Sequence, residues 1–479
     1  MLFYKIKGVN ILKKEKSITK KILTTKNNIS KYDYQSKDGN KYKTKFNVIK
    51  LLCRRSKNLY NVGLYSVRQN FFNKKEYLKY TDNYHLLHYH KNYQMLPNDI
   101  SQHVLKLVEQ DFKSFFGLLK KKQSNNYDSK IKIPKYKEKK GFDTLTIPKN
   151  HIRPLGIDKI YLSLPKNLKR YLDNKFLEFK LPKGITYDNL KMIKIKPIVI
   201  DNKMISYTIN WNYQIDIKNT MKSTDNLLSI DLGIDNIVSM VNSFNGESIL
   251  FNGLELKSLN RYFNKKISKF QSELKQSQDK NHSIKINNLY DKRNNLINEY
   301  LHSISNKIVD YCLNNNISKI IIGNNKEWKQ NINIGKTNNQ NFVSIPHSKL
   351  INYIQYKSEL YGIKIILQEE SFTSKCDSLV LESLPKYKKS NKDIIEKNIN
   401  PLSKKKYLGK RIKRGLFLSS NGKVLNSDIN GAINIMRKYL QTNKKCKLES
   451  EIISRIEASG LIYNPLKVTI NNRRSSIFI

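Results

Sequence analysis

Apolar residues recur every three or four positions in two stretches near the start of the chain, and this spacing predicts two amphipathic helices. The first stretch covers residues 46–67, and the second follows Pro97 and closes with three lysines. Asn98 or Asp99 can cap the second helix, and its terminal lysines complement the negative end of the helix dipole. The pattern therefore predicts a helical domain over residues 45–124.

Short runs that alternate apolar and polar residues follow over residues 125–225, which is typical of half-buried strands. The clearest pair is a hairpin within residues 192–211. Several such runs predict a small antiparallel barrel, to which residues 1–44 contribute the first part. Tyr207 and Trp211 follow the alternation, so we interpret them as inward-facing, although exposed aromatic residues could instead stack on bases.

A third pattern begins at residue 226, where three short apolar runs precede two long helical stretches, a strand, a helix and a last strand. Antiparallel strands followed by alternating helices and strands is the order of an RNase H-like fold. We assign residues 226–372 and 427–445 to this α/β domain, 373–426 to an insert, and 446–479 to a tail without an assigned role. The fold class is α/β with additional β-barrel and helical parts. The strands are expected at 227–232, 237–241, 248–251, 319–322 and 363–367.

Two aspartates far apart in the sequence are candidates for one site. Asp231 ends the apolar run LLSID, and a charge is expected to emerge at the end of a buried strand, where a cation can compensate it. By itself, a strand-end aspartate is more often structural. Asp428 shares one face of a predicted helix with Gly431, and this small residue lets the helix approach a sheet closely. The two carboxylates can therefore meet.

The charge of the chain indicates a polyanionic partner. Lys and Arg number 89 against 39 Asp and Glu, which gives a formal net charge of +50. In a compact protein, so many positively charged side chains repel one another, and bound nucleic acid relieves the repulsion. An AT-rich genome also enriches Lys and Asn, so each single lysine carries less weight than the sum.

The sequence predicts neither a membrane protein nor a disulfide-stabilised protein. No apolar run approaches the roughly 20 residues that cross a bilayer, and the first residues lack the layout of a signal peptide. We therefore expect a cytoplasmic, nucleoid-associated protein of a prokaryotic-type cell. No cysteine belongs to a CxxC pair, so we expect neither a disulfide framework nor a zinc ribbon. The four cysteines are Cys53, Cys312, Cys376 and Cys446.

Six segments, in this order, resemble the TnpB family of transposon-encoded RNA-guided nucleases, which are related to type V CRISPR effectors. They are LYNVGLYSVRQ, LPNDISQHVLKLVEQDFKSFF, DLGIDN, KRNNLINEYLHSISNKIVDYC, SFTSKC and DINGAINI, and they span most of the chain between residues 57 and 440. The resemblance implies a RuvC nuclease domain with lid and bridging helices, an N-terminal wedge barrel and a helical recognition domain. It also implies that Asp231 and Asp428 are two of three catalytic carboxylates.

Phosphodiester hydrolysis by the two-metal route needs carboxylates that hold two divalent ions about 3.5–4 Å apart. Oxygen ligands suit Mg²⁺ or Mn²⁺, so two such ions are the expected cofactors.

The third carboxylate departs from the family pattern, because Gly323 stands where the glutamate of the second RuvC motif is usual. Glu327 follows in a predicted loop, while Glu369 and Glu370 close the last expected strand. Neighbouring strands lie about 4.8 Å apart, so a glutamate from the last strand could reach over the glycine. Only one of this pair can point at the metals, and we favour Glu370. If none of Glu327, Glu369 and Glu370 serves as the third carboxylate, the nuclease is inactive.

The insert also departs from the family, whose two CxxC pairs are missing here. We expect local contacts to replace the zinc ribbon. A basic run in the insert is either a solvated surface or a contact for phosphate groups. Its charged residues are Lys404, Lys405, Lys406, Lys410, Arg411, Lys413 and Arg414.

Three functions compete. The first is an RNA-guided DNA endonuclease with a guide RNA from the transposon end, which cuts double-stranded DNA that carries a short adjacent motif. The second is a nuclease-inactive guided DNA-binding protein that acts as a repressor or transposon regulator. The third, a strand-joining transposase, ranks below both because no segment resembles a terminal-sequence-binding domain. The oligomeric state is left open.

Overall fold

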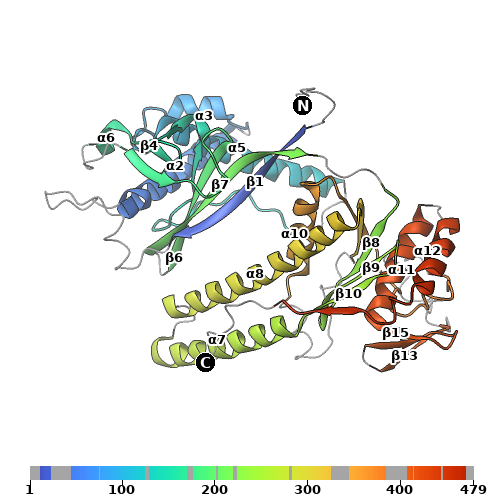
Figure 1. Ribbon diagram of the computed structural model, residues 1–479. Helices are drawn as coiled ribbons and strands as arrows, with labels where there is room; N and C mark the ends of the chain where they lie inside the picture. The colour runs from blue at the N-terminus through green and yellow to red at the C-terminus, as the bar shows by residue number, and fades with distance from the viewer. Residues whose placement is uncertain are drawn as a thin grey trace. The chain divides into compact units, whose positions relative to one another are not determined.

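The computed structural model contains two compact units. The first is Lys13–Asp216, and the second consists mainly of the chain from Ile217 onward. Figure 1 labels the helices and strands of both units. The described residues are 11–22, 45–74, 76–124, 129–169, 176–200, 203–218, 224–279, 283–324, 345–384, 407–413, 415–443 and 446–470.

Two long helices form the centre of the first unit, as the apolar spacing predicts. Helices α2 and α5 contact each other, and a Cβ on Gly63 would lie 2.8 Å from Leu105 Cδ2, so the glycine permits their close approach. The capping prediction for α5 is wrong, because Pro97 occupies the N-cap position and Asp99 lies in the first turn. The helices are α2 (Lys45–Lys74), α3 (Tyr80–Leu87), α4 (Lys91–Gln94), α5 (Asn98–Gln123) and α6 (Lys166–Lys169).

The strands of the first unit form a four-stranded sheet, β1-β7-β6-β2, and a three-stranded sheet, β3-β4-β5. The hairpin of β6 and β7 is confirmed, and Tyr207 and Trp211 are buried within it, at 3% and 1% exposure. The closed barrel stays a prediction. The strands are β1 (Ile11–Ile22), β2 (Leu145–Pro148), β3 (Ile152–Pro154), β4 (Lys159–Ser163), β5 (Phe176–Lys180), β6 (Leu190–Ile200) and β7 (Lys203–Lys218).

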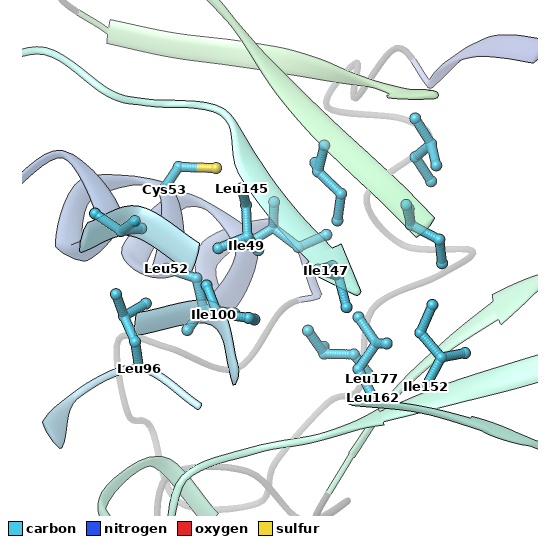
Figure 2. Packing of buried hydrophobic residues seen from close by; sticks show 14 of the residues in the cluster. Ile49, Leu52, Cys53, Leu96, Ile100, Leu145, Ile147, Ile152, Leu162 and Leu177 are labelled. Carbon is cyan, nitrogen blue, oxygen red and sulfur yellow. The ribbon is translucent and has the colours of Figure 1, made fainter. Parts of the chain in front are cut away.

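One apolar core runs through the helices and both sheets of this unit. Figure 2 shows side chains from α2, such as Ile49 and Leu52, beside Ile100 of α5 and Leu145 and Ile147 of β2. Ile152, Leu162 and Leu177 extend the same core to the smaller sheet. Burial of this apolar surface is the main force that holds the unit together.

The second unit is built on a six-stranded sheet with the order β12-β11-β8-β9-β10-β16. Strands β8, β9 and β10 are antiparallel to one another, while β11 runs parallel to β8 and β12 parallel to β11. The last strand, β16, joins β10 and comes from the tail to which the sequence assigned no role. The strands are β8 (Leu227–Asp231), β9 (Asn236–Asn242), β10 (Ser248–Asn252), β11 (Lys319–Gly323), β12 (Lys364–Gln368) and β16 (Leu466–Val468).

Helices cover both faces of this sheet (Figure 1). Leu228 and Ile230 point into a core shared with α8 and α10, while Leu227 and Ile321 point into the core beneath α11 and α12. The central strands are therefore apolar on both faces, as the continuous runs predict. The helices are α7 (Leu254–Gln278), α8 (Ile284–Asn314), α10 (His347–Glu359), α11 (Ser427–Thr442) and α12 (Cys446–Ala458). None of the helices in the described part of the chain has the length and apolar character that a bilayer crossing demands.

Hydrogen bonds join the two ends of the insert. The buried Asp377 carboxylate accepts hydrogen bonds from the Ser419 hydroxyl at 2.7 and 2.9 Å and from the Ser420 N–H at 2.7 Å. A small antiparallel sheet consists of β13 (Lys410–Lys413), β14 (Leu416–Leu418) and β15 (Val424–Asn426). Ser419 immediately follows β14, in the turn that leads to β15. This link ties the described end of the insert to the segment that follows β12.

Arg437 of α11 is completely buried and organises the contacts around the insert. Its Nε donates to Glu449 Oε1 at 2.8 Å, and its Nη1 donates to Asn434 Oδ1 at 2.7 Å. Its Nη2 donates to the Glu382 carbonyl at 2.8 Å. One guanidinium thus connects α11, α12 and the start of the insert, and a buried charge of this kind is tolerated because it is paired and hydrogen-bonded.

We predict that Arg437→Met destabilises the protein by about 3–5 kcal/mol, because it leaves the buried Glu449 carboxylate without its cation. Urea unfolding monitored by circular dichroism measures the loss. Adding Glu449→Met to Arg437→Met should recover most of it, since both charges are then gone. The control is Lys423→Met, which breaks the exposed ion pair with Glu457 and should change stability little. Equal stability of Arg437→Met and the wild type would contradict the prediction.

Candidate active site

Asp231 stands at the carboxyl end of the central strand β8, as the sequence predicts. Helix α11 crosses this end so closely that a Cβ on Gly431 would lie 2.5 Å from Asp231 Oδ2. No side chain larger than glycine fits at this turn of the helix without movement of the carboxylate. The small residue that the sequence places on the sheet-facing side of α11 thus allows the aspartate and the helix to meet.

Asp428 lies in the first turn of α11, where a negative charge is favoured by the helix dipole. The Asn426 side chain caps the helix by accepting hydrogen bonds from the backbone N–H groups of Asp428 and Ile429, at 2.9 and 3.3 Å. Asn236, the first residue of β9, donates its Nδ2 to Asp428 Oδ2 at 2.8 Å. The cap and the asparagine together fix the carboxylate beside the end of the sheet.

Glu370 takes the place that Gly323 leaves open. In the parallel pairing of β11 and β12, Gly323 is opposite Gln368, and Glu370 follows two residues later. A Cβ on Gly323 would lie 2.5 Å from Glu370 Oε2 and 2.5 Å from Ile435 Cδ1. The glutamate carboxylate therefore fills the space above the glycine, next to α11.

Glu369 faces a different partner. Its carboxylate forms an ion pair with Lys438 of α11 and accepts a hydrogen bond from the Ser371 N–H at 2.6 Å. The two successive glutamates thus have different partners. Glu370 interacts electrostatically with Asp231, while Glu369 pairs with the Lys438 ammonium group.

The pKa values reflect this crowding of carboxylates. Burial raises the pKa of Asp231 well above its usual range, and the nearby Glu370 and Asp428 raise it further. Burial raises the pKa of Glu370 to about 7, helped by Glu369 and opposed by Lys438. Burial also acts to raise the pKa of Glu369, but hydrogen bonds from Lys438 and Ser371 outweigh it and lower that pKa. Asp231 and Glu370 thus share a region where negative charge is unfavourable without a cation.

This donor set fits a hard divalent cation. Asp231, Glu370 and Asp428 offer carboxylate oxygens, which Mg²⁺ and Mn²⁺ prefer. A bound cation would offset the burial and the repulsion that raise the pKa values of Asp231 and Glu370. In the described ranges, no three His, Cys, Asp or Glu side chains are yet gathered closely enough to ligate one ion.

The basic run of the insert is only partly described. Lys404, Lys405, Lys406 and Arg414 lie outside the described residues, as does Glu327. Lys410 and Lys413 are exposed on β13. On the same strand, Arg411 donates to Ser427 Oγ at 2.8 Å, and its Nη2 lies 3.9 Å from Asp428 Oδ1.

Two residues at this site were not predicted from the sequence. Asn236 lies inside the DLGIDN motif, and its position at the start of the next strand was a usable signal for contact with the end of β8. Lys438 comes seven residues after Gly431 on α11 and so lies two turns further along the same side of the helix. This spacing was a second usable signal.

Two protein-family models match segments that lie almost entirely within the second unit. A family model described as probable transposase (OrfB_IS605) matches residues 210–329, and one described as Cas12f1-like, TNB domain, matches residues 347–435. The TnpB-like protein ORF457 of Acidianus two-tailed virus is 26% identical over 223 residues. That match covers 44% of this chain and 41% of the viral protein, so the chain spans less than half of that relative.

Two solved structures overlap with the fold. The cryo-EM structure of the Cas12f1-sgRNA-target DNA complex contains a chain with 15% identity and a TM-score of 0.49, and the overlap covers 81% of this chain and 82% of that one. The cryo-EM structure of a CRISPR-Cas12f ternary complex overlaps with a TM-score of 0.30, at 15% identity and 81% coverage of both chains.

The pKa shifts predict opposite effects of two neighbouring substitutions in the metal-free protein. The pKa of Glu370 is raised, so the stability associated with its protonated form is lost as the pH rises through about 7. Glu370→Gln should therefore stabilise the protein by about 2 kcal/mol near pH 8 and change it little near pH 5. Urea unfolding with a chelator present measures the difference.

Glu369→Gln is the matched control. Because the pKa of Glu369 is lowered, its ionised form stabilises the fold above the ordinary carboxyl pKa, and that stability is lost as the pH falls. This variant should be less stable than the wild type near pH 8. If both substitutions shift stability in the same direction near pH 8, the assignment of the two side chains is wrong.

Proposed function

Since the chain belongs to the TnpB family, we propose that it is an RNA-guided DNA endonuclease that cuts its target in a RuvC site formed by Asp231, Glu370 and Asp428. The observation that carries this proposal is the position of Glu370 above Gly323. It supplies a third carboxylate where the second RuvC motif lacks one. The strand order of the six-stranded sheet, with β8 central and flanked by β9 and β11, supports an RNase H-like assignment for this domain.

The three carboxylates would hold two Mg²⁺ or Mn²⁺ ions. When bound, such ions activate water for attack on a phosphodiester and stabilise the leaving oxygen. Neighbouring residues of this chain position the carboxylates. Asn236 holds Asp428 by a hydrogen bond, and Gly431 leaves room for Asp231 beneath the helix.

Arg411 is suited to bind the phosphate of the strand to be cut. Its side chain is 56% exposed, and its Nη2 lies 3.9 Å from Asp428 Oδ1. A guanidinium offers several N–H donors in a planar fork that matches phosphate oxygens. Arg411 would therefore orient the substrate beside the carboxylates.

The proposed partners are a guide RNA from the transposon end and double-stranded DNA with a short adjacent motif. Base pairing with the guide would supply sequence specificity, while the protein would contact backbones and the motif. The net charge of +50 suits a surface that faces two phosphate backbones. The helical part over residues 45–124 and the strands that precede residue 226 would hold the RNA and the target.

A nuclease-inactive guided DNA-binding protein is the second candidate, and Gly323 is the observation that favours it. The loss of a motif-two glutamate is expected when a nuclease is retained only for binding. An inactive site, however, gives no reason for the Glu370 carboxylate to fill the space above Gly323 and to interact electrostatically with Asp231, which makes the nuclease the better-supported function.

We predict that the protein copurified with its RNA linearises a plasmid that carries the target and its adjacent motif in the presence of Mg²⁺. Asp231→Ala, Asp428→Ala and Glu370→Ala should each abolish cleavage, because each removes an oxygen ligand of the ions. Gel-shift titration should show unchanged target binding by the same variants. A wild type that binds its guided target and leaves it uncut would establish the second candidate instead.

A separate prediction concerns Arg411. Arg411→Ala should slow cleavage by about tenfold or more at saturating target, because it removes a cationic donor aimed at the reacting phosphate. Lys410→Ala is the matched control, since Lys410 is the adjacent exposed cation on β13 and points to the opposite side of the strand. An equal loss in both variants would assign Arg411 to general DNA attraction.

A further inference from the structure

Glu370 does not lie on a regular element. Strand β12 ends at Gln368, and the chain turns immediately after Glu370, where Phe372 has a left-handed φ of 68°. A glutamate at position 323 would instead be fixed by the hydrogen bonds of a central strand. The relocated carboxylate therefore needs another source of rigidity if it is to serve as a ligand.

Lys438 supplies contacts on both sides of Glu370. Its Nζ forms an ion pair with the preceding residue, Glu369, and donates to the carbonyl of the following residue, Ser371, at 2.9 Å. Glu369 in turn accepts from the Ser371 N–H at 2.6 Å. A single ammonium group thus brackets the backbone of Glu370.

The burial of Lys438 indicates that this contact is a substantial one. Its side chain is 7% exposed, whereas that of Glu369 is 39% exposed. Removing an ammonium group from water is unfavourable unless strong hydrogen bonds and an opposite charge replace the water. Lys438 belongs to α11, the helix that also carries Asp428 and Gly431, so it ties the turn with Glu370 to the element that carries the neighbouring carboxylate.

We propose that Lys438, acting through Glu369 and Ser371, is the positioning residue that holds Glu370 against Asp231 in place of a glutamate on β11. This inference rests on the proposed function, because it assumes that Glu370 is a metal ligand. It goes further by naming the side chain that makes the relocated ligand usable.

Whether Mn²⁺ binding becomes weaker or tighter when Lys438 is replaced distinguishes a positioning role from a purely electrostatic one. Removing a positive charge beside a cation site should strengthen metal binding by Coulomb's law. If Lys438 positions Glu370, its removal should weaken binding instead, by about tenfold, the range found when a residue that orients a metal ligand is lost. Mn²⁺ binding is followed by electron paramagnetic resonance on the protein with its RNA. The Asp231→Ala complex serves as the blank for ions bound to the RNA, and the difference gives the dissociation constant of the carboxylate site.

The variants are Lys438→Met and Lys438→Gln, with Lys357→Met as the matched control. Lys357 of α10 also donates its ammonium to a carbonyl, that of His302 at 2.9 Å, and to the Ser305 hydroxyl at 2.6 Å. It lies on the face of the sheet opposite to α11. We expect weaker Mn²⁺ binding in both Lys438 variants and unchanged binding in Lys357→Met, with all three folded by circular dichroism.

A glutamate introduced at position 323 on β11 provides a second test of the positioning role. The triple variant Gly323→Glu, Glu370→Ala and Ile435→Val places the carboxylate on β11. It removes the two atoms that would lie 2.5 Å from a Cβ at position 323 and leaves Ile435 Cγ1 at 3.3 Å. In this background the sheet holds the glutamate, so adding Lys438→Met should no longer weaken Mn²⁺ binding, and loss of the positive charge should leave it equal or tighter.

Each outcome decides the inference. Tighter Mn²⁺ binding in the Lys438 variants, an equal loss in Lys357→Met, or a loss that persists in the Gly323→Glu background would overturn it. Unfolding of both Lys438 variants would overturn it too, because Lys438 would then be a residue of general stability. Mn²⁺ binding that depends on Lys438 in a protein that never cuts DNA would support the positioning role and refute the nuclease.

Discussion

The closeness of α11 to the carboxyl end of β8 is the constraint on which the site depends. Two glycines make it possible, because Gly431 removes the side chain that would strike Asp231, and Gly323 removes the one that would strike Ile435 of the helix. Both positions are ones where even a methyl group would force neighbouring atoms to move. The site is therefore a consequence of backbone approach as much as of acidic side chains.

Close approach brings an electrostatic cost with it. Three carboxylates at one edge of a sheet repel one another, and burial raises the pKa of Asp231 and of Glu370. The surroundings offset part of this cost by helix-dipole and hydrogen-bond contacts to Asp428 and by a lysine near Glu370. The remainder makes the carboxylate cluster unfavourable without a divalent ion, and this is the physical reason why the same residues suit metal binding.

The fold of the second unit follows from the sequence to a large extent. Apolar runs predict β8 to β11, because strands buried on both faces need apolar residues throughout. The edge strand β12 is also predicted by its apolar run, although its side chains are only partly buried. The placement of Asp428 near Asp231 also follows, since helical spacing puts Gly431 and Asp428 on one side of α11. The tail was beyond such patterns, because β16 is a three-residue strand whose pairing with β10 depends on a partner more than 200 residues away. The N-cap of α5 failed for a local reason, since Pro97 sits in extended backbone one residue before the predicted cap.

The pair of glutamates shows where sequence patterns stop. Strand alternation says that Glu369 and Glu370 point to opposite sides, but it does not say which of them faces Asp231. The Lys438 ammonium group determines the arrangement, because its ion pair with Glu369 turns that side chain away and leaves Glu370 on the side of Asp231. A residue at the far end of another helix decides between two chemically identical side chains, and no local pattern around position 370 contains that information. The position of a relocated ligand is thus determined by tertiary contacts, while the need for one can be recognised from the glycine at position 323 alone.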